Sequence, residues 1–272
     1  MKKTIIVPTD FSDSAANALS YACKFARDYN LNILLVHIYS IPRSYAAEGL
    51  SLTTINDAMD EDRVRLKNEL EHVKNKYSNI HFEAKMITGD FLETLQELKR
   101  ELDPALIIMG AVMEYSELSL WDDDWLNALI TVSCPVLVIP QHIAYSPILR
   151  IAYATDNKKP CLPEQTDVIK KLVRLSNASF YIVHITPKSG PQEENANTAL
   201  NEVFSDIKPQ YHIVENRSVI RGMAEFIKQY HIDLLLVMPR KHGLWHNLFN
   251  KSYTKQLALL NDLPVMAMHD ND

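Results

Sequence analysis

TIIVPTD, at Thr4–Asp10, and LRIAYATD, at Leu149–Asp156, decide the fold of this chain, because each is an apolar run that ends in Thr-Asp. Further apolar runs then recur in the same order in both halves: ILLVHI (Ile33–Ile38) with FYIVHI (Phe180–Ile185), ALIIMGA (Ala105–Ala111) with DLLLVMP (Asp233–Pro239), and CPVLVIP (Cys134–Pro140) with LPVMAMH (Leu263–His269). Landmarks repeated in one order indicate the tandem duplication of a single fold.

The length of the chain fits two domains of ordinary size. With 272 residues, each half is long enough to bury a hydrophobic core of its own. We predict one domain at residues 1–142 and a second domain at residues 148–272, with the linker at Pro140–Pro147. The hydrophobic content of 47% is that of a soluble globular chain.

Charge and cysteine content exclude several classes of protein. The formal net charge is -6, and the basic runs are only pairs such as Lys158-Lys159, so we expect no nucleic-acid partner. The 3 cysteines are widely spaced and odd in number, which argues against a disulfide framework and for a reducing compartment. No apolar run approaches the length of a membrane span, so we expect no membrane association and a cytoplasmic location.

Strand and helix patterns alternate along both halves. In the first half, short apolar runs predict strands near residues 5–7, 33–37, 80–87, 105–109 and 136–139. Apolar residues at helical spacing predict helices near residues 10–29, 55–77, 91–102 and 125–132. This alternation predicts an α/β fold with two tandem doubly wound domains, each a five-stranded, mainly parallel sheet with helices on both faces.

The last strand of each half has no further strand to cover it. The two candidate strands are short apolar runs, each directly following a proline, within Pro135–Ile139 and Pro264–Met268. Because an exposed sheet edge favours aggregation, we expect the two halves to pair with each other through these strands. The first half also carries extra residues at 39–54, which we expect to form a loop over one end of the sheet, either as a lid or as a plain connection.

The chain resembles a tandem universal stress protein. In the first half, the resemblance is carried by VPTDFSDSA (Val7–Ala15), LLVHI (Leu34–Ile38), TGD (Thr88–Asp90), LIIMGA (Leu106–Ala111) and CPVLVIP (Cys134–Pro140). In the second half, it is carried by YATD (Tyr153–Asp156), IVHI (Ile182–Ile185), RGMAEFI (Arg221–Ile227), LLLVMPRKHG (Leu234–Gly243) and LPV (Leu263–Val265). The resemblance implies a five-stranded doubly wound domain that pairs through its last strand, and an ancestral link to ATP.

In the first half, the resemblance also implies a degraded ATP site. The ATP-binding branch of the family has Gly-two residues-Gly-nine residues-Gly-Ser/Thr after the fourth strand, where backbone N–H groups approach the phosphates. Here only Gly110 is kept, Met113 replaces the second glycine, and Asp122-Asp123 stands at the Gly-Ser position. We interpret Asp122–Asp124 as a cap for the helix near Trp125, with a cation site as the alternative.

In the second half, Pro239 and His242 replace the first two glycines. The loop is instead polar and cationic, and an anion could bind there through its side chains; its candidate ligand residues are Arg240, Lys241, His242, Ser252 and Lys255. The alternative is a solvated surface loop. Asp10 and Asp156 follow the first strand of each half, and the resemblance implies contacts with adenosine there; each could equally cap the turn that follows.

No nucleophile motif, phosphate-binding loop with lysine, or metal-ligand cluster stands out, so we assign no catalytic residue and no metal ligand. The leading interpretation is a cytoplasmic stress-response binding or scaffold protein with no resident cofactor and with an intramolecular domain pair. The alternative is a protein that binds, and slowly hydrolyses, adenine nucleotide at the second-half loop, with weak affinity for ATP. A third interpretation is a small-molecule carrier. The protein partner, the ligand and a homodimer of the whole chain stay open.

Overall fold

The computed structural model describes residues 2–40, 52–111, 124–155, 163–186, 200, 202–239 and 263–269. The first half contains β1 (Thr4–Pro8), α1 (Asp13–Tyr29), β2 (Asn32–Tyr39), α3 (Leu52–Lys76), β3 (Phe82–Thr88), α4 (Phe91–Leu102), β4 (Leu106–Ala111), α5 (Asp124–Thr131) and β5 (Val136–Pro140). The second half contains β6 (Arg150–Thr155), α6 (Pro163–Ser176), β7 (Ser179–Thr186), the 3-10 helix η1 (Ser205–Ile207), β8 (Gln210–Glu215), α8 (Val219–Tyr230), β9 (Leu234–Val237) and β10 (Val265–Ala267). The first half therefore has the alternating order that the sequence predicted, and the described elements of the second half follow it up to β9, with residues 240–262 before β10 outside the described part of the chain.

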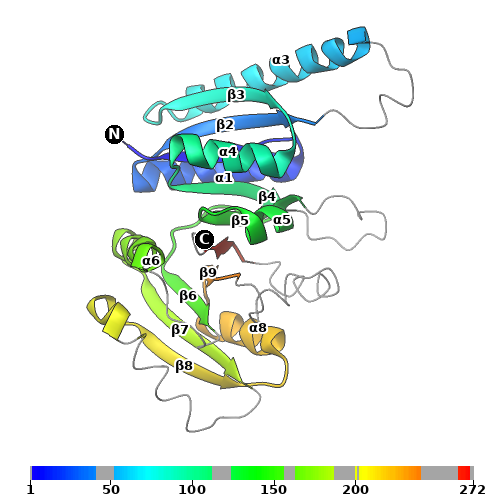
Figure 1. Cartoon of the computed structure of the whole chain (residues 1–272). Helices are drawn as coiled ribbons and strands as arrows, with labels where there is room; N and C mark the ends of the chain where they lie inside the picture. The colour runs from blue at the N-terminus through cyan, green and yellow to red at the C-terminus, as the bar shows by residue number, and fades with distance from the viewer. Residues whose placement is uncertain are drawn as a thin grey trace.

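The ten strands of the described residues belong to one continuous sheet, in the order β3-β2-β1-β4-β5-β10-β9-β6-β7-β8. Within each half, neighbouring strands are parallel. The halves join where β10 pairs antiparallel with β5, with Met266 opposite Leu137. The predicted pairing through the last strands is therefore confirmed, and each of these strands is covered by the other half (Figure 1).

Helices cover both faces of this sheet (Figure 1). The core on one face includes side chains of α1, α3 and α6, and the core on the other face includes side chains of α4, α5 and α8. Successive residues of β1 alternate between them, with Ile5 and Val7 in the first core and Ile6 in the second. Because both faces are covered, the central strands are apolar throughout, which explains their continuous hydrophobic runs.

The segment at residues 39–54 contains fewer loop residues than the sequence analysis predicted. Residues 39–54 were predicted to be a loop, but Tyr39 extends β2 and α3 already begins at Leu52. Strand β2 reaches this far because Tyr39 continues its register with β3, opposite Thr88. Residues 41–51 lie outside the described residues.

The linker after β5 is fastened to the first half by polar contacts. The side-chain amide of Asn17, in α1, donates hydrogen bonds to the carbonyl oxygens of Pro140 at 3.1 Å and Ile143 at 3.0 Å. Farther along, the Tyr145 hydroxyl donates to the Asp28 carboxylate at 2.6 Å. Residues 140–145 are thus held along α1.

The two cysteines that the structure describes are structural. Cys23 and Cys134 are free thiols, and both are buried. Burial raises the pKa of each to about 12, so neither forms a reactive thiolate near neutral pH. In the described part of the chain, no helix is both long and apolar enough to span a bilayer.

Candidate functional site

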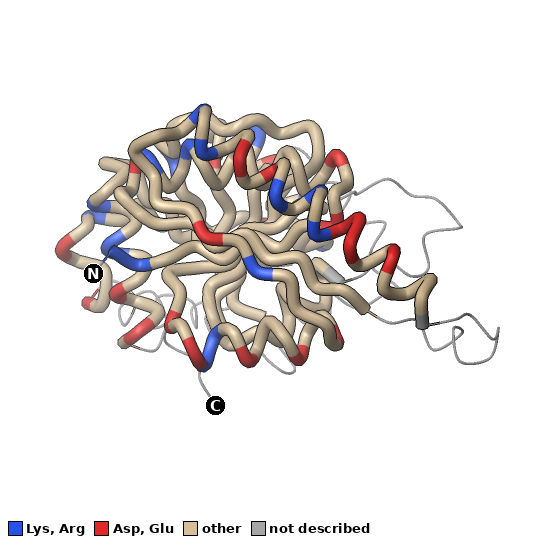
Figure 2. The backbone as a smooth tube through the Cα atoms, turned by 90° about the horizontal axis from the view of Figure 1, so that it is seen from above, with Lys and Arg blue, Asp and Glu red and all other residues tan. Residues whose placement is uncertain are grey.

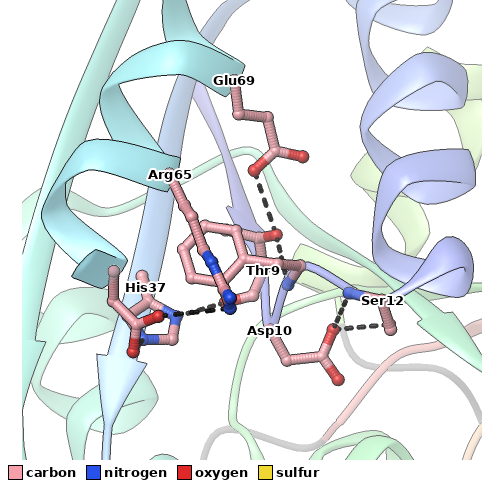
Figure 3. Close-up of polar contacts among 8 residues, drawn as sticks. Thr9, Asp10, Ser12, His37, Arg65 and Glu69 are labelled. Atoms are coloured by element: carbon pink, nitrogen blue, oxygen red, sulfur yellow. Dashed lines mark hydrogen bonds and ion pairs between the residues drawn. The ribbon is translucent and has the colours of Figure 1, made fainter. Parts of the chain in front are cut away.

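Polar and aromatic side chains gather where β1 and β2 end, beside α3 (Figure 3). Their positions are those where ligands bind in open α/β sheets, at the carboxyl ends of the strands. Helix α3 brings Asp62, Arg65 and Glu69 to this place, because their spacing sets them on one face of the helix. We call Thr9, Phe11, His37, Asp62, Arg65 and Glu69 the strand-end cluster.

Asp10, one of the predicted contacts, organises the turn between β1 and α1. Its Oδ1 accepts hydrogen bonds from the Ser12 backbone N–H at 3.0 Å and from the Ser12 hydroxyl at 2.5 Å. The Ser12 Oγ in turn accepts from the Ala15 N–H at 3.3 Å and caps α1. The sequence left open whether Asp10 contacts adenosine or caps the turn that follows. These hydrogen bonds show that it stabilises the turn.

Phe11 adopts a backbone conformation that is uncommon for a side chain of its size. Its φ of 65° lies in the left-handed region, and its N–H donates to the Thr9 Oγ1 at 3.1 Å. The ring lies 4.5 Å, centroid to centroid, from the His37 imidazole, and the Arg65 guanidinium carbon is 6.0 Å from the ring centre. The strained turn therefore places an aromatic ring over the end of β2.

His37 is enclosed and is contacted at both ring nitrogens. Its Nδ1 lies 2.8 Å from the Thr9 carbonyl oxygen, and since a carbonyl only accepts, Nδ1 carries the proton of this hydrogen bond. Its Nε2 lies 3.3 Å from the Asp62 Oδ2, an ion pair when the imidazole carries both protons. That Nε2 is buried and forms no hydrogen bond of good geometry. The imidazole ring of His37 therefore makes its polar contacts with Thr9 and Asp62, inside the cluster.

Glu69 links α3 to the end of β1. Its Oε2 accepts a hydrogen bond from the Thr9 hydroxyl at 3.2 Å. Burial raises the pKa of the Glu69 carboxyl, and the negative charge of Asp10 adds to this. The Thr9 hydrogen bond and the nearby His37 and His72 act in the opposite direction, but the pKa stays above its ordinary value. The ionised form of the Glu69 carboxyl is therefore less favourable in the folded protein than in water.

The charge around these strand ends is mainly negative. Carboxylates of Asp10, Asp62 and Glu69 lie here, and Arg65 is the basic member of the cluster, with its Nη1 3.6 Å from the Asp62 Oδ1. Figure 2 shows acidic positions concentrated toward the N-terminal part of α3, with basic positions mixed in farther along. Such a surface disfavours a polyphosphate.

Gly110, the remaining glycine of the family motif, has a packing role. A Cβ built on Gly110 would lie 2.3 Å from the carbonyl oxygen of Ser14 and 2.5 Å from its carbonyl carbon. Both atoms belong to the backbone of the first turn of α1, which cannot yield as a flexible side chain would. The close approach of α1 to β4 therefore suffices to explain this glycine.

In the second half, the strand ends repeat part of this geometry. The Nδ1 of His184 lies 3.1 Å from the carbonyl oxygen of Thr155, as in the His37 contact. Strands β6 and β9 are neighbours, with Ala154 opposite Val237, so the segments that follow them start at one edge of the sheet. The predicted ligand residues themselves lie outside the described part of the chain: Asp156, Arg240, Lys241, His242, Ser252 and Lys255.

Most of the replaced loop of the first half also lies outside the described residues, including Met113, Asp122 and Asp123. Helix α5 begins at Asp124, close to the predicted start near Trp125. The structure further adds residues that sequence reasoning missed, namely Thr9, Asp62, Arg65 and Glu69. The available signal was the spacing of the charged residues along 62–69, which sets them on one helical face, but their contact with residues 9 and 37 depends on the sheet.

Comparison with known proteins agrees with this architecture. Residues 1–140 match the Universal stress protein family. A universal stress protein from Synechocystis sp. is 24% identical to the chain, and the aligned region covers 97% of this chain and 99% of that protein.

Solved structures resemble the whole chain. A universal stress protein from Archaeoglobus fulgidus superimposes with a TM-score of 0.76 at 15% identity, covering 99% of this chain and 97% of that one. A protein of unknown function from Pseudomonas aeruginosa PAO1 superimposes with a TM-score of 0.59 at 17% identity, covering 100% and 94%. At such identities, the likeness shows a shared fold and arrangement of two halves.

Proposed function

The chain belongs to the universal stress protein family, and from this premise we propose that it is a non-catalytic binding or scaffold protein of the stress response, with degraded ATP sites. The observation that carries the proposal is the strand-end cluster. Where an open α/β sheet offers its ligand position, the first half places the Phe11 ring on His37 and bonds Glu69 to Thr9.

Two physical features of the cluster support a first half that binds no ATP. The carboxylates of Asp62 and Glu69 lie at the ends of β2 and β1, where an open α/β sheet binds its ligand, and their negative charge disfavours a polyanion such as ATP. In addition, Gly110 is explained by the approach of α1, so this glycine is no sign of a retained phosphate cradle. The interpretation of Asp122–Asp124 as a built-in helix cap in place of phosphate extends the same idea, and it stays a proposal.

The absence of catalytic turnover is part of the proposal. A general base must come within hydrogen-bond reach of a substrate proton. The His37 Nε2 is closed off from solvent and faces Asp62, while the Cys23 and Cys134 thiols are buried with a raised pKa. We further propose that the protein has no resident cofactor and acts in the cytoplasm, the compartment in which such unpaired cysteines are common.

The test is nucleotide content and affinity. The purified chain is denatured, and the supernatant is analysed by chromatography for released adenine nucleotide; we expect none in stoichiometric amount. Calorimetric titration of the native protein with Mg-ATP should likewise show no saturable binding at high salt concentration. One equivalent of released nucleotide would overturn the proposal of degraded ATP sites. Tight binding that is lost in Phe11 or Glu69 variants would overturn it as well, and would place ATP in the first half.

A second candidate function is weak adenine-nucleotide binding by the second half. The adjacency of β6 and β9 favours it, because the segments after both strands start together. We propose that the phosphates would be held by Arg240, Lys241, His242, Ser252 and Lys255, with Asp156 near the adenosine moiety. Side-chain cations bind anions in a strongly salt-dependent way. Changing Arg240 and Lys241 to Ala should therefore abolish any such binding; tight binding that survives high salt and this double change would exclude the loop.

A further inference from the structure

The two outer strands of the ten-stranded sheet differ in how they are protected. At one end, β3 carries exposed Glu83 and Lys85 within the strand, and charged residues of this kind hinder the addition of another strand. At the other end, β8 has no Asp, Glu, Lys or Arg between Gln210 and Glu215, and the side chain of Ile213 is 40% exposed. Strand β8 thus carries its one charged residue, Glu215, at its end, and has no charge at the mid-strand positions that block pairing in β3.

A hollow lies beside this unprotected strand. It measures about 320 Å³ and is lined by residues of β8 and by Glu225, Phe226, Gln229 and Tyr230 of α8. On its apolar side, the His212 ring lies 4.7 Å from Tyr230 and 5.1 Å from Phe226, and Phe226 stacks on Tyr230 at 4.3 Å. Burial lowers the pKa of His212, so this aromatic wall is uncharged at neutral pH. An edge strand beside a helix, with an apolar wall between them, is the setting in which extended peptides add to sheets.

The charged members of the lining are both carboxylates. Glu215 closes β8, and Glu225 projects from α8, while Arg221 and Lys228 of that helix are outside the lining. The Asn216 amide donates to the Glu225 Oε2 at 3.3 Å, which positions the carboxylate without neutralising it. A carboxylate next to aromatic rings favours a cation with an aliphatic stem, as in Lys or Arg.

We propose that the hollow between β8 and α8 is a groove that binds an extended basic peptide by strand addition to β8. The peptide's backbone would pair with the edge of β8 that no described strand occupies. Its Lys or Arg side chains would point toward Glu225 and the aromatic wall, and its alternate apolar side chains would lie over Ile213 on the other face. This inference rests on the proposed binding function, because it names the class of partner that the protein would bind, namely a basic peptide.

The test uses fluorescence polarisation with a labelled peptide, Gly-Ser-Val-Lys-Val-Lys-Val-Ser-Gly, and the full chain. Glu225→Lys should weaken binding about five- to tenfold, because it reverses the charge that faces the peptide. Ile213→Lys, which gives β8 the kind of mid-strand charge that β3 has, should weaken it as well. Glu97→Lys, an exposed position of α4, is the matched control and should bind as the unchanged protein does. Circular dichroism confirms that each variant is folded.

Two control peptides separate charge from backbone pairing. A version with Glu in place of Lys should bind at least about tenfold more weakly, and a version N-methylated through its five central residues should not bind, because it cannot pair with the strand edge. No binding at about 1 mM peptide, equal binding of the Glu peptide, or indifference to Glu225→Lys would each overturn the proposal. Concentration-dependent self-association that Ile213→Lys abolishes, without peptide binding, would assign the edge to a second copy of the chain instead. The nucleotide titration is independent of all these outcomes.

Discussion

The Nδ1 of His37 lies 2.8 Å from the carbonyl oxygen of Thr9. The duplication preserves this relationship, since His184 makes the same contact with Thr155 at 3.1 Å. In both halves, a histidine near the end of the second strand thus reaches the backbone at the end of the first strand. A contact that recurs in both copies while the surrounding side chains differ points to a role in holding the strand ends together.

Replacing His37 should therefore destabilise the first half. His37→Ala leaves the buried Thr9 carbonyl without this donor and removes the ring from Phe11, so the free energy of unfolding should fall by about 1–3 kcal/mol. His37→Asn keeps an N–H group near the Nδ1 position and should lose less than half as much. Urea unfolding followed by circular dichroism measures both. Equal losses in the two variants would mean that ring packing, and not the hydrogen bond, stabilises this place.

The sheet was predictable because its signals are local and repeated. Runs such as Ile5–Val7 and Val136–Pro140 alternate with helical patterns, and a sheet covered on both faces needs continuous apolar strands. The pairing of the last strands followed from the same pattern, because each would otherwise leave an apolar edge exposed. The strand-end cluster could not be predicted in this way, since the contact of Glu69 with Thr9 joins residues 60 positions apart.

The glycine motif shows a second limit of the sequence. Gly110 was interpreted through its resemblance to a phosphate-binding loop, but it also faces Ser14, in a helix almost a hundred residues earlier. A pattern in one loop cannot reveal which distant backbone approaches it. The length of the loop at 39–54 was overestimated for a similar reason, because Tyr39 is drawn into β2 by its pairing with Thr88.

Gly110→Ala tests the packing role directly. The added Cβ would meet the backbone of Ser14 at 2.3 Å, and the resulting strain should lower the free energy of unfolding by about 3 kcal/mol. Gly89→Ala is the matched comparison, because its Cβ would meet a side-chain hydroxyl, that of Thr94, at 2.9 Å. Chemical denaturation should rank Gly110→Ala as clearly the more damaging of the two; the reverse order would contradict the close approach of α1 to β4.

The linker contact between Tyr145 and Asp28 makes a separate prediction. Tyr145→Phe removes a 2.6 Å hydrogen bond to a carboxylate but keeps the ring in its edge-to-face contact with Tyr21. Since the Asp28 side chain is still 35% exposed to solvent, the loss should be only about 1 kcal/mol. Amide exchange in residues 140–147 should become faster, because the linker is then less firmly held along α1.

A double-mutant cycle assigns that loss to the pair. Asp28→Asn removes the charge that strengthens the bond, so the change in Tyr145→Phe,Asp28→Asn should be smaller than the sum of the two single changes. Strict additivity would mean that the two side chains do not interact in solution, and that the linker is held by Asn17 alone among these contacts.

Glu69 makes a prediction whose sign depends on pH. Burial raises its pKa in the folded state, so folding disfavours the ionised carboxyl. At low pH the carboxyl is protonated in both the folded and the unfolded chain, and it brings no penalty. As the pH rises from the ordinary pKa of the carboxyl through the raised one, the unfolded chain ionises first, so Glu69 makes the fold progressively less stable. Above the raised pKa, the penalty is complete and constant.

Glu69→Gln cannot ionise, yet its amide oxygen can still accept the hydrogen bond from Thr9. The stability of this variant relative to the unchanged protein should therefore increase as the pH rises from the ordinary pKa of the carboxyl, about 4.3, to neutral and slightly alkaline values. Urea unfolding at several pH values across this range measures the difference, and Glu61→Gln, an exposed position of the same helix, controls for the loss of one negative charge from α3. If the two variants follow the same pH profile, the fold does not disfavour the ionised carboxyl of Glu69, and α3 does not bury this carboxylate against the end of β1.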